Sequence, residues 1–215
     1  MKVAVFFDLD GTLTDPGEGI TNSVMFALKR FGIEVTDRRK LYPFIGPPLT
    51  DSFMEYYGFS HEQAMLAIKY YREYYEPTGI FENKLYGGIS DMLKVLKAAG
   101  KTLVLATSKP ENMAIRVLKK YEIFEPFDFV CGASMDETRT EKADVIRYAL
   151  SVSGVSPKNA VMVGDRKYDI LGAHANGMQA VGVLFGYGTK DELEAAGAEH
   201  TVADVEELKE YLLKI

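Results

Sequence analysis

Short apolar runs alternate with helical patterns of apolar residues over the part of this chain that follows Gly87. We predict strands at residues 102–106, 127–131, 160–163 and 180–184, and helices beginning near residues 89, 110, 140, 169, 191 and 205. An almost unbroken apolar run at residues 3–7 adds a strand buried on both faces. Repeated strand–helix units predict an α/β fold, a doubly wound parallel, Rossmann-like sheet with helices on both faces.

The segment between the first two predicted strands is far longer than the dozen or so residues that a parallel crossover needs. Long structureless loops are uncommon inside compact domains, so this segment is expected to fold by itself. Helical spacing of apolar residues recurs around residues 20–31, 53–57 and 60–77, and Ser60 is a good N-cap. We therefore predict a helical cap at residues 15–82, inserted into a core made of residues 1–14 and 83–215.

Three prolines and a glycine form a stiff break within the predicted cap. Residues 41–49 contain Pro43, Gly46, Pro47 and Pro48, which together are expected to interrupt any helix. Because the break separates two cap helices, we expect Gly46, Pro47 and the nearby Ser52 to take part in selecting the substrate.

Composition excludes several classes of protein. The 215-residue chain carries a formal net charge of −6 with its basic residues scattered, so a nucleic-acid polymer is not expected as a partner. Its one cysteine, Cys131, excludes an internal disulfide and suits a cytoplasmic location. No apolar run approaches the length that spans a membrane, so no membrane association is expected. A monomer and a homodimer both fit a chain of this size.

The strand predicted at residues 3–7 stops at two carboxylates, Asp8 and Asp10, which are followed by Gly11. Side chains alternate along a strand, so Asp8 and Asp10 would share one side of the sheet if the extended geometry persists. Neighbouring carboxylates repel and are costly to bury unless a positive charge lies between them. A hard cation such as Mg²⁺ supplies that charge most simply. The alternative is a polar turn in which Asp and Gly serve turn chemistry.

Polar residues also follow two other predicted strands. Thr107-Ser108-Lys109 comes after residues 102–106, and Gly164-Asp165 comes after residues 160–163, with Asp169 close behind. The carboxyl ends of parallel strands meet at one edge of the sheet, where open α/β sheets bind ligands. Carboxylates, a hydroxyl, lysines and the N–H groups of helix starts together suit a phosphate held by a metal ion.

In this order these residues resemble the haloacid dehalogenase superfamily. The resemblance rests on Asp8-Leu9-Asp10-Gly11-Thr12, on Thr107 after a strand, on a lysine that opens a helix, and on Gly164-Asp165 with Asp169. The cap between the first two motifs corresponds to the C1-cap branch, and within it the chain resembles phosphoglycolate phosphatase-like hydrolases. Phe44-Ile45-Gly46-Pro47-Pro48-Leu49 and Gly182-Val183-Leu184-Phe185-Gly186-Tyr187-Gly188 also resemble a bacterial 5′-nucleotidase-like subgroup.

The resemblance implies a role for each acidic residue. Asp8 would be the nucleophile that forms an aspartyl-phosphate, and Asp10 would be the general acid and base. Mg²⁺ would be held by the Asp8 carboxylate, the Asp10 backbone carbonyl and Asp165, with Asp169 adjusting the shell directly or through water.

The resemblance also implies which groups hold the phosphate. Thr107 and the backbone N–H of Ser108 would bind its oxygens, and Lys142 would neutralise charge on Asp8 and on the phosphate. The family pattern often has prolines after this lysine, whereas Ala143 and Asp144 follow Lys142 here. Lys109, two residues after Thr107, is therefore an alternative for the active-site lysine.

Together these features predict a Mg²⁺-dependent phosphate monoester hydrolase that acts on a small phosphorylated metabolite of the phosphoglycolate kind. Three alternatives share the same core chemistry, namely a nucleoside 5′-monophosphatase, a pyrophosphatase and a sugar-phosphate mutase. A phosphate-binding regulator without turnover is an alternative of another class.

Overall fold

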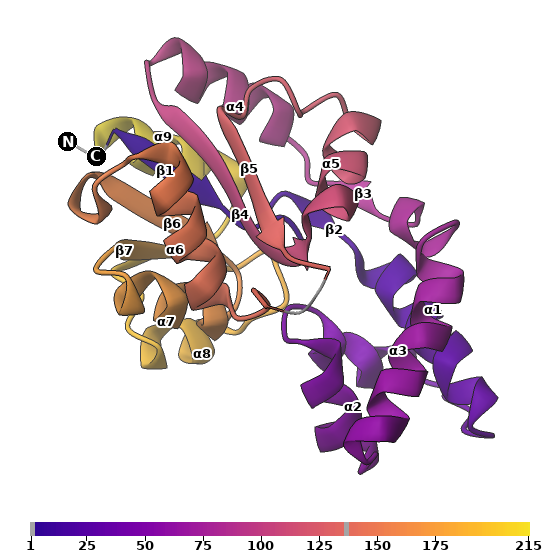
Figure 1. Cartoon of the computed structure of the whole chain (residues 1–215). Coiled ribbons are helices and arrows are strands. Elements are labelled where there is room, and N and C mark those ends of the chain that lie inside the picture. Colours follow the sequence, from indigo (N-terminus) through magenta and orange to yellow (C-terminus); the bar gives the residue numbers. More distant parts are fainter. Residues whose placement is uncertain (1–2, 136–137) are drawn as a thin grey trace. The chain divides into compact units, whose positions relative to one another are not determined.

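The computed structural model describes residues 3–135 and 138–215, which divide into two compact units (Figure 1). One unit runs to Thr14 and resumes at Leu85, and the other is Asp15–Lys84. We expected the second crossing between the units at residues 82–83, two residues earlier. The crossings form a two-stranded sheet of β2 (Thr14–Asp15) and β3 (Lys84–Leu85).

The first unit is built on a six-stranded parallel sheet with the order β5-β4-β1-β6-β7-β8. The strands are β1 (Ala4–Phe7), β4 (Thr102–Pro110), β5 (Phe129–Ala133), β6 (Ala160–Gly164), β7 (Gln179–Val183) and β8 (His200–Val202). In register, Phe7 at the end of β1 lies beside Leu105 of β4 and Val163 of β6. The predicted fold class is confirmed, and one of the two middle strands, β1, leads to Asp8.

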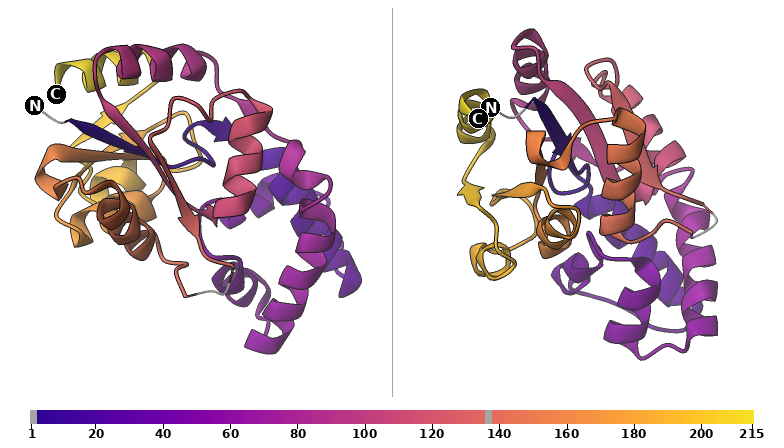
Figure 2. Two further views of the ribbon diagram at one scale, coloured as in Figure 1. Left: turned by 45° about the horizontal axis from the view of Figure 1, so that its top comes forward. Right: turned by 60° about the vertical axis from the view of Figure 1, so that its left-hand side comes forward.

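Helices cover both faces of this sheet (Figure 2). They are α4 (Ile89–Ala98), α5 (Glu111–Lys120), α6 (Lys142–Ser153), α7 (Lys167–Ala175), α8 (Lys190–Ala195) and α9 (Val205–Lys214), with a short 3-10 helix at Pro157–Asn159. On one face, Phe6 packs in a buried cluster with residues of α6 and α7, including Ile146 and Ile170. Full burial of an apolar side chain of this size stabilises the fold by about 1.5–3 kcal/mol. This packing fixes β1, and with it the position of the acids that follow.

Three sequence-based expectations for this unit need correction. The strand predicted at residues 127–131 is found at Phe129–Ala133, because a turn at residues 124–127 precedes it. In that turn the Phe127 N–H donates to the Phe124 carbonyl at 3.1 Å, and the Asp128 carboxylate accepts the Leu103 N–H at 2.8 Å. Helix α7 begins at Lys167 and not at Asp169, and β8 was not predicted.

The second unit consists of helices. It contains α1 (Gly17–Arg30), a 3-10 helix at Arg38–Phe44, α2 (Leu49–Tyr57), α3 (His61–Tyr75) and a 3-10 helix at Gly79–Phe81. Ser60 caps α3 as predicted, since its hydroxyl accepts the Gln63 N–H at 3.2 Å while the Gln63 side chain accepts the Ser60 N–H at 2.9 Å.

The expectation that residues 41–49 hold no helix was wrong in part. The 3-10 helix at Arg38–Phe44 passes through Pro43, and only residues 45–48 separate it from α2. Its start is capped by Asp37, whose carboxylate accepts the Arg39 N–H at 3.1 Å. A short 3-10 helix leaves several N–H groups without an internal partner, so the missing N–H of a proline costs little there.

Across the described part of the chain, every helix is too short or too polar to span a lipid bilayer.

Candidate active site

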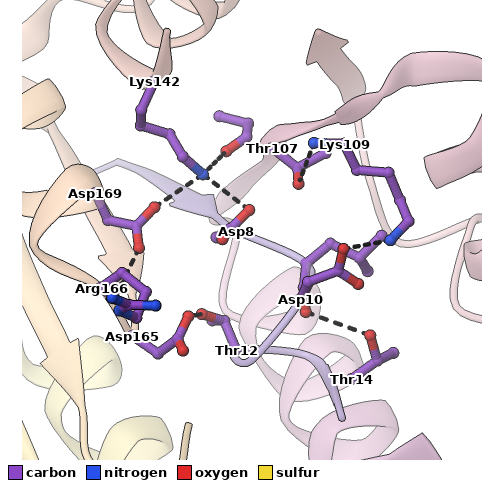
Figure 3. A network of polar contacts seen from close by, with 12 residues as sticks. Asp8, Asp10, Thr12, Thr14, Thr107, Lys109, Lys142, Asp165, Arg166 and Asp169 are labelled. Carbon is purple, nitrogen blue, oxygen red and sulfur yellow. Dashed lines mark hydrogen bonds and ion pairs between the residues drawn. The ribbon is translucent and has the colours of Figure 1, made fainter. Parts of the chain in front are cut away.

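The ends of three neighbouring strands bring the predicted acids and the predicted threonine together (Figure 3). Asp8 follows β1, Thr107 lies near the end of β4, and Asp165 follows β6. The Asp8 N–H donates to the Val163 carbonyl of β6 at 2.9 Å, which holds the ends of β1 and β6 side by side. The expected convergence of sequence-distant residues at one sheet edge is therefore present.

Three buried carboxylates form a compact group at this edge. One oxygen from each of Asp8, Asp165 and Asp169 lies within 4.8 Å of the others, and the three residues are at most 5% exposed. Among residues 3–135 and 138–215, the Lys142 ammonium is the one partner of Oδ1 of Asp8 and of Oδ1 of Asp169. Hard divalent cations take carboxylate oxygens as ligands. The residues present therefore fit Mg²⁺.

Lys142 lies between two of these acids. It is the first residue of α6, and its ammonium is 2.8 Å from both Asp8 Oδ1 and Asp169 Oδ1 and donates to the Ala106 carbonyl at 3.1 Å. Burial alone would lower the pKa of this ammonium, but the charges of Asp169 and Asp8 outweigh it and raise the pKa above its ordinary value. Lys142 therefore stays charged at neutral pH, beside the predicted nucleophile.

Asp165 is oriented by two groups that the sequence did not single out. The Thr12 hydroxyl donates to its Oδ1 at 3.3 Å, and the Tyr187 N–H donates to its Oδ2 at 2.8 Å. Burial, with the nearby charges of Asp169 and Asp8, raises the pKa of Asp165 well above its usual range. In a protein without a bound cation, a proton is thus held more tightly here than on an exposed aspartate.

Three glycines, one after β1 and two in the loop at residues 186–188, leave room for Asp165. A Cβ atom at Gly188 would lie 1.9 Å from the Asp165 backbone oxygen, and one at Gly186 would lie 2.3 Å from the Asp165 Cβ. Gly11 has a φ of 87°, and a Cβ there would lie 2.2 Å from Asp165 Oδ2. The loop at residues 186–188 is thus part of the support for Asp165.

Asp169 lies in the first turn of α7. Its Oδ2 accepts the N–H of Arg166, the N-cap residue of α7, at 3.1 Å. This hydrogen bond satisfies a backbone donor at the start of the helix. Burial raises the pKa of Asp169 to about 6, although the Lys142 charge acts in the opposite direction. A Cβ atom at Gly164 would lie 2.1 Å from the Asp169 Cγ. The absence of a side chain at Gly164 therefore leaves room for the Asp169 carboxylate.

A second ion pair joins Asp10 and Lys109. Oδ2 of Asp10 contacts the Lys109 ammonium, and the two side chains are 13% and 4% exposed. Burial raises the pKa of Asp10 against the lowering effect of Lys109. The lysine that sequence analysis treated as an alternative to Lys142 is therefore also at the site, on a different acid.

The predicted phosphate-binding groups lie at the end of β4. Thr107 is buried, and its hydroxyl accepts the Lys109 N–H at 3.2 Å. Pro110, not Thr107, occupies the N-cap position of α5, so the threonine hydroxyl does not cap this helix. Ser108 lies between Thr107 and Lys109 in β4 and is partly exposed.

The residues expected to select the substrate belong to the second unit. Gly46 has a φ of 108° and lies with Pro47 between the 3-10 helix at Arg38–Phe44 and α2. The Ser52 hydroxyl donates to the Pro48 carbonyl at 3.1 Å, within the first turn of α2. A role for these three residues in specificity stays a prediction.

Known proteins resemble this chain in sequence and structure. The family described as haloacid dehalogenase-like hydrolase matches residues 5–183. A 5′-nucleotidase of Pseudomonas aeruginosa is 44% identical over 208 residues, covering 97% of this chain and 94% of that protein. The tyrosine-protein kinase PtkA of Mycobacterium tuberculosis is 38% identical over 97% of this chain and 72% of its own length. A crystal structure of a predicted phosphatase from Clostridium acetobutylicum matches with a TM-score of 0.98 and 46% identity, covering 100% of both chains.

Proposed function

The chain belongs to the haloacid dehalogenase-like hydrolase family, and we propose that it is a Mg²⁺-dependent phosphate monoesterase working through an aspartyl-phosphate. Membership confirms the family that the sequence motifs resemble and the expected class of enzyme, a phosphatase. The observation that carries the finer proposal is the position of Asp8, which directly follows β1 and lies beside Asp165, Asp169 and the Lys142 ammonium.

In the proposed first step, an Asp8 carboxylate oxygen attacks phosphorus in line with the ester oxygen. A bond from Asp8 to phosphorus forms, the phosphorus–ester bond breaks, and Asp10 gives a proton to the departing alcohol oxygen. In the second step, Asp10 takes a proton from a water molecule that attacks the aspartyl-phosphate. Phosphate leaves, and both carboxyl groups return to their starting states.

The remaining residues reduce the electrostatic repulsion between the Asp8 carboxylate and the substrate phosphate. Asp8, Asp165 and the Asp10 backbone carbonyl would hold Mg²⁺, with Asp169 beside them, and the cation would offset the negative charge of nucleophile and phosphate. The Lys142 ammonium, 2.8 Å from Asp8, adds a fixed positive charge. The Thr107 hydroxyl and the Ser108 N–H would bind non-bridging phosphate oxygens.

For the substrate, we propose nucleoside 5′-monophosphates first and phosphoglycolate second. The sequence motifs by themselves favoured phosphoglycolate. The 44% identity to a protein named 5′-nucleotidase, over nearly the full length of both chains, favours the nucleotide. The resemblance of residues 182–188 to the 5′-nucleotidase-like subgroup supports the same order.

The proposal is tested by phosphate release from a panel of nucleoside 5′-monophosphates, phosphoglycolate, pyrophosphate and a sugar phosphate, with Mg²⁺ and with chelator. We expect release that needs Mg²⁺ and that falls by more than about a thousandfold in Asp8→Asn. Because one relative is named a tyrosine-protein kinase, a tyrosine peptide should be included as an acceptor. Undiminished release by Asp8→Asn would overturn the mechanism. An absence of release by the folded native chain would favour a mutase or a phosphate-binding regulator.

A further inference from the structure

Two buried lysines contact different acids of the site. Lys142 contacts Asp8 and Asp169, whereas Lys109 contacts Asp10, and both lysines are less than 10% exposed. Ordering a lysine side chain costs rotamer entropy, and removing its charge from water costs still more. A buried lysine is therefore informative about the group that it contacts. The proposed function uses Lys142 and leaves Lys109 without a role.

The backbone places Lys109 at the site through an irregular strand end. Strand β4 continues past Thr107 to Pro110, and its register with β5 shifts between these two residues. Gly132 of β5 permits the close approach, because a Cβ atom there would lie 2.6 Å from the Lys109 carbonyl oxygen. Figure 3 shows the Lys109 side chain extending from this strand end to Asp10, apart from Lys142.

The two carboxylate oxygens of Asp10 differ in their contacts. Oδ2 contacts the ammonium, whereas Oδ1 is buried and has no hydrogen-bond partner within residues 3–135 and 138–215. A carboxyl group held by one oxygen has its rotation restricted, and here no hydrogen bond from the described residues engages its second oxygen. Position matters here, because a general acid must lie within hydrogen-bond reach of the oxygen that it protonates.

We infer that Lys109 is a positioning residue, which anchors Oδ2 of Asp10 so that Oδ1 serves as the proton-exchanging atom. The inference rests on the proposed function, in which Asp10 protonates the leaving alcohol. It gives the two lysines different roles, since Lys142 supports the nucleophile and Lys109 supports the general acid.

This role predicts a dependence on the leaving group. Phenyl phosphate and p-nitrophenyl phosphate have similar shapes, but phenolate is the poorer leaving group and gains more from protonation. General acid catalysis contributes about 10²–10⁴-fold where it is needed. We therefore expect Lys109→Met to lower kcat/KM at least about tenfold more for phenyl phosphate than for p-nitrophenyl phosphate. Because kcat/KM reports the steps up to the aspartyl-phosphate, later hydrolysis does not obscure the difference.

The experiment measures kcat/KM for both esters in the native chain, Lys109→Met, Lys109→Arg, Asp10→Asn and the double variant Asp10→Asn/Lys109→Met. We expect Lys109→Arg to recover part of the loss, and Lys109→Met to add little in the Asp10→Asn background. Lys94→Met, at an exposed lysine of α4, serves as the matched control. The double variant removes both charges of the pair, so it keeps the comparison available if Lys109→Met alone does not fold.

Equal losses on both esters would overturn the inference, because they would indicate a structural or substrate-binding role for Lys109. So would an effect of Lys109→Met that is unchanged in the Asp10→Asn background. The proposed function fails separately, if the native chain releases phosphate from neither ester or if Asp8→Asn keeps the native rate. In that case the inference falls with it.

Discussion

The ammonium of Lys142 lies midway between two acids, 2.8 Å from Asp8 Oδ1 and 2.8 Å from Asp169 Oδ1. It reaches them because α6 begins at Lys142, whose ammonium also donates to the Ala106 carbonyl of β4. Without a cation, three buried carboxylates would otherwise repel one another. The free energy of unfolding should therefore depend on the charges of Lys142, Asp8 and Asp169.

Replacing Lys142 with methionine should destabilise the metal-free protein. The change leaves buried carboxylates without their counter-charge, and breaking a buried ion pair from one side costs about 3–5 kcal/mol. Urea unfolding in the presence of chelator measures the loss. Lys94→Met is the control, since Lys94 is exposed on α4. A loss no larger than that of the control would contradict the account, and addition of Mg²⁺ should recover part of it.

Gly188→Ala should weaken Mg²⁺ binding. The added Cβ would lie 1.9 Å from the Asp165 backbone oxygen, so Asp165 must shift. Changes to groups that orient a metal ligand typically cost about 10–100-fold in metal affinity. Calorimetric titration with Mg²⁺ measures the change. Gly87→Ala is the matched control, because a Cβ at Gly87 has no heavy atom within 4 Å. Equal affinity in the two variants would show that the loop does not support Asp165.

Thermal stability in the absence of metal should fall as pH rises through about 6. The pKa of Asp169 is raised from 3.8 to about 6 in the folded chain, so folding favours its protonated form. The stability from this proton is fully present below pH 3.8 and is lost as pH rises through about 6. Because Mg²⁺ held by these carboxylates would displace the proton, the rise in melting temperature on adding Mg²⁺ should be larger above pH 6 than below it.

Melting curves with chelator and with Mg²⁺, recorded on both sides of that pH, give this comparison. Asp169→Asn should reduce the pH dependence of the metal-free protein. A stabilisation by Mg²⁺ that is the same at both pH values would indicate that these carboxylates are ionised throughout.

The strands and the positions of the acids were predictable because local pattern decides them. An apolar run that stops at Asp8 identifies β1, and parallel topology then brings Thr107 and Asp165 to the same edge. Strand β8 was not predicted because His200–Val202 is short and contains one buried apolar residue. Three residues are too few for an alternating pattern that would separate a strand from a loop. The start of β5 was displaced because Phe127 looks like a strand residue but lies in a turn.

The contacts that orient the acids were not predictable from local pattern. Thr12 donates to Asp165 across 153 residues of sequence, and Lys109 meets Asp10 across 99. The Tyr187 N–H that holds Asp165 is a backbone group, and its residue type carries no signal for that role. Such pairings follow from how the strand ends lie in the folded sheet.

The central claim, a covalent phosphoryl group on Asp8, is tested most directly by trapping it. The native chain is mixed with substrate and Mg²⁺, quenched in acid and reduced with borohydride, which converts a phosphorylated aspartate to homoserine. Peptide mapping by mass spectrometry then locates the change. We predict it at position 8, dependent on Mg²⁺ and absent when substrate is omitted. Rapid phosphate release under the same conditions with Asp8 unmodified, or with the change at another residue, would contradict the account.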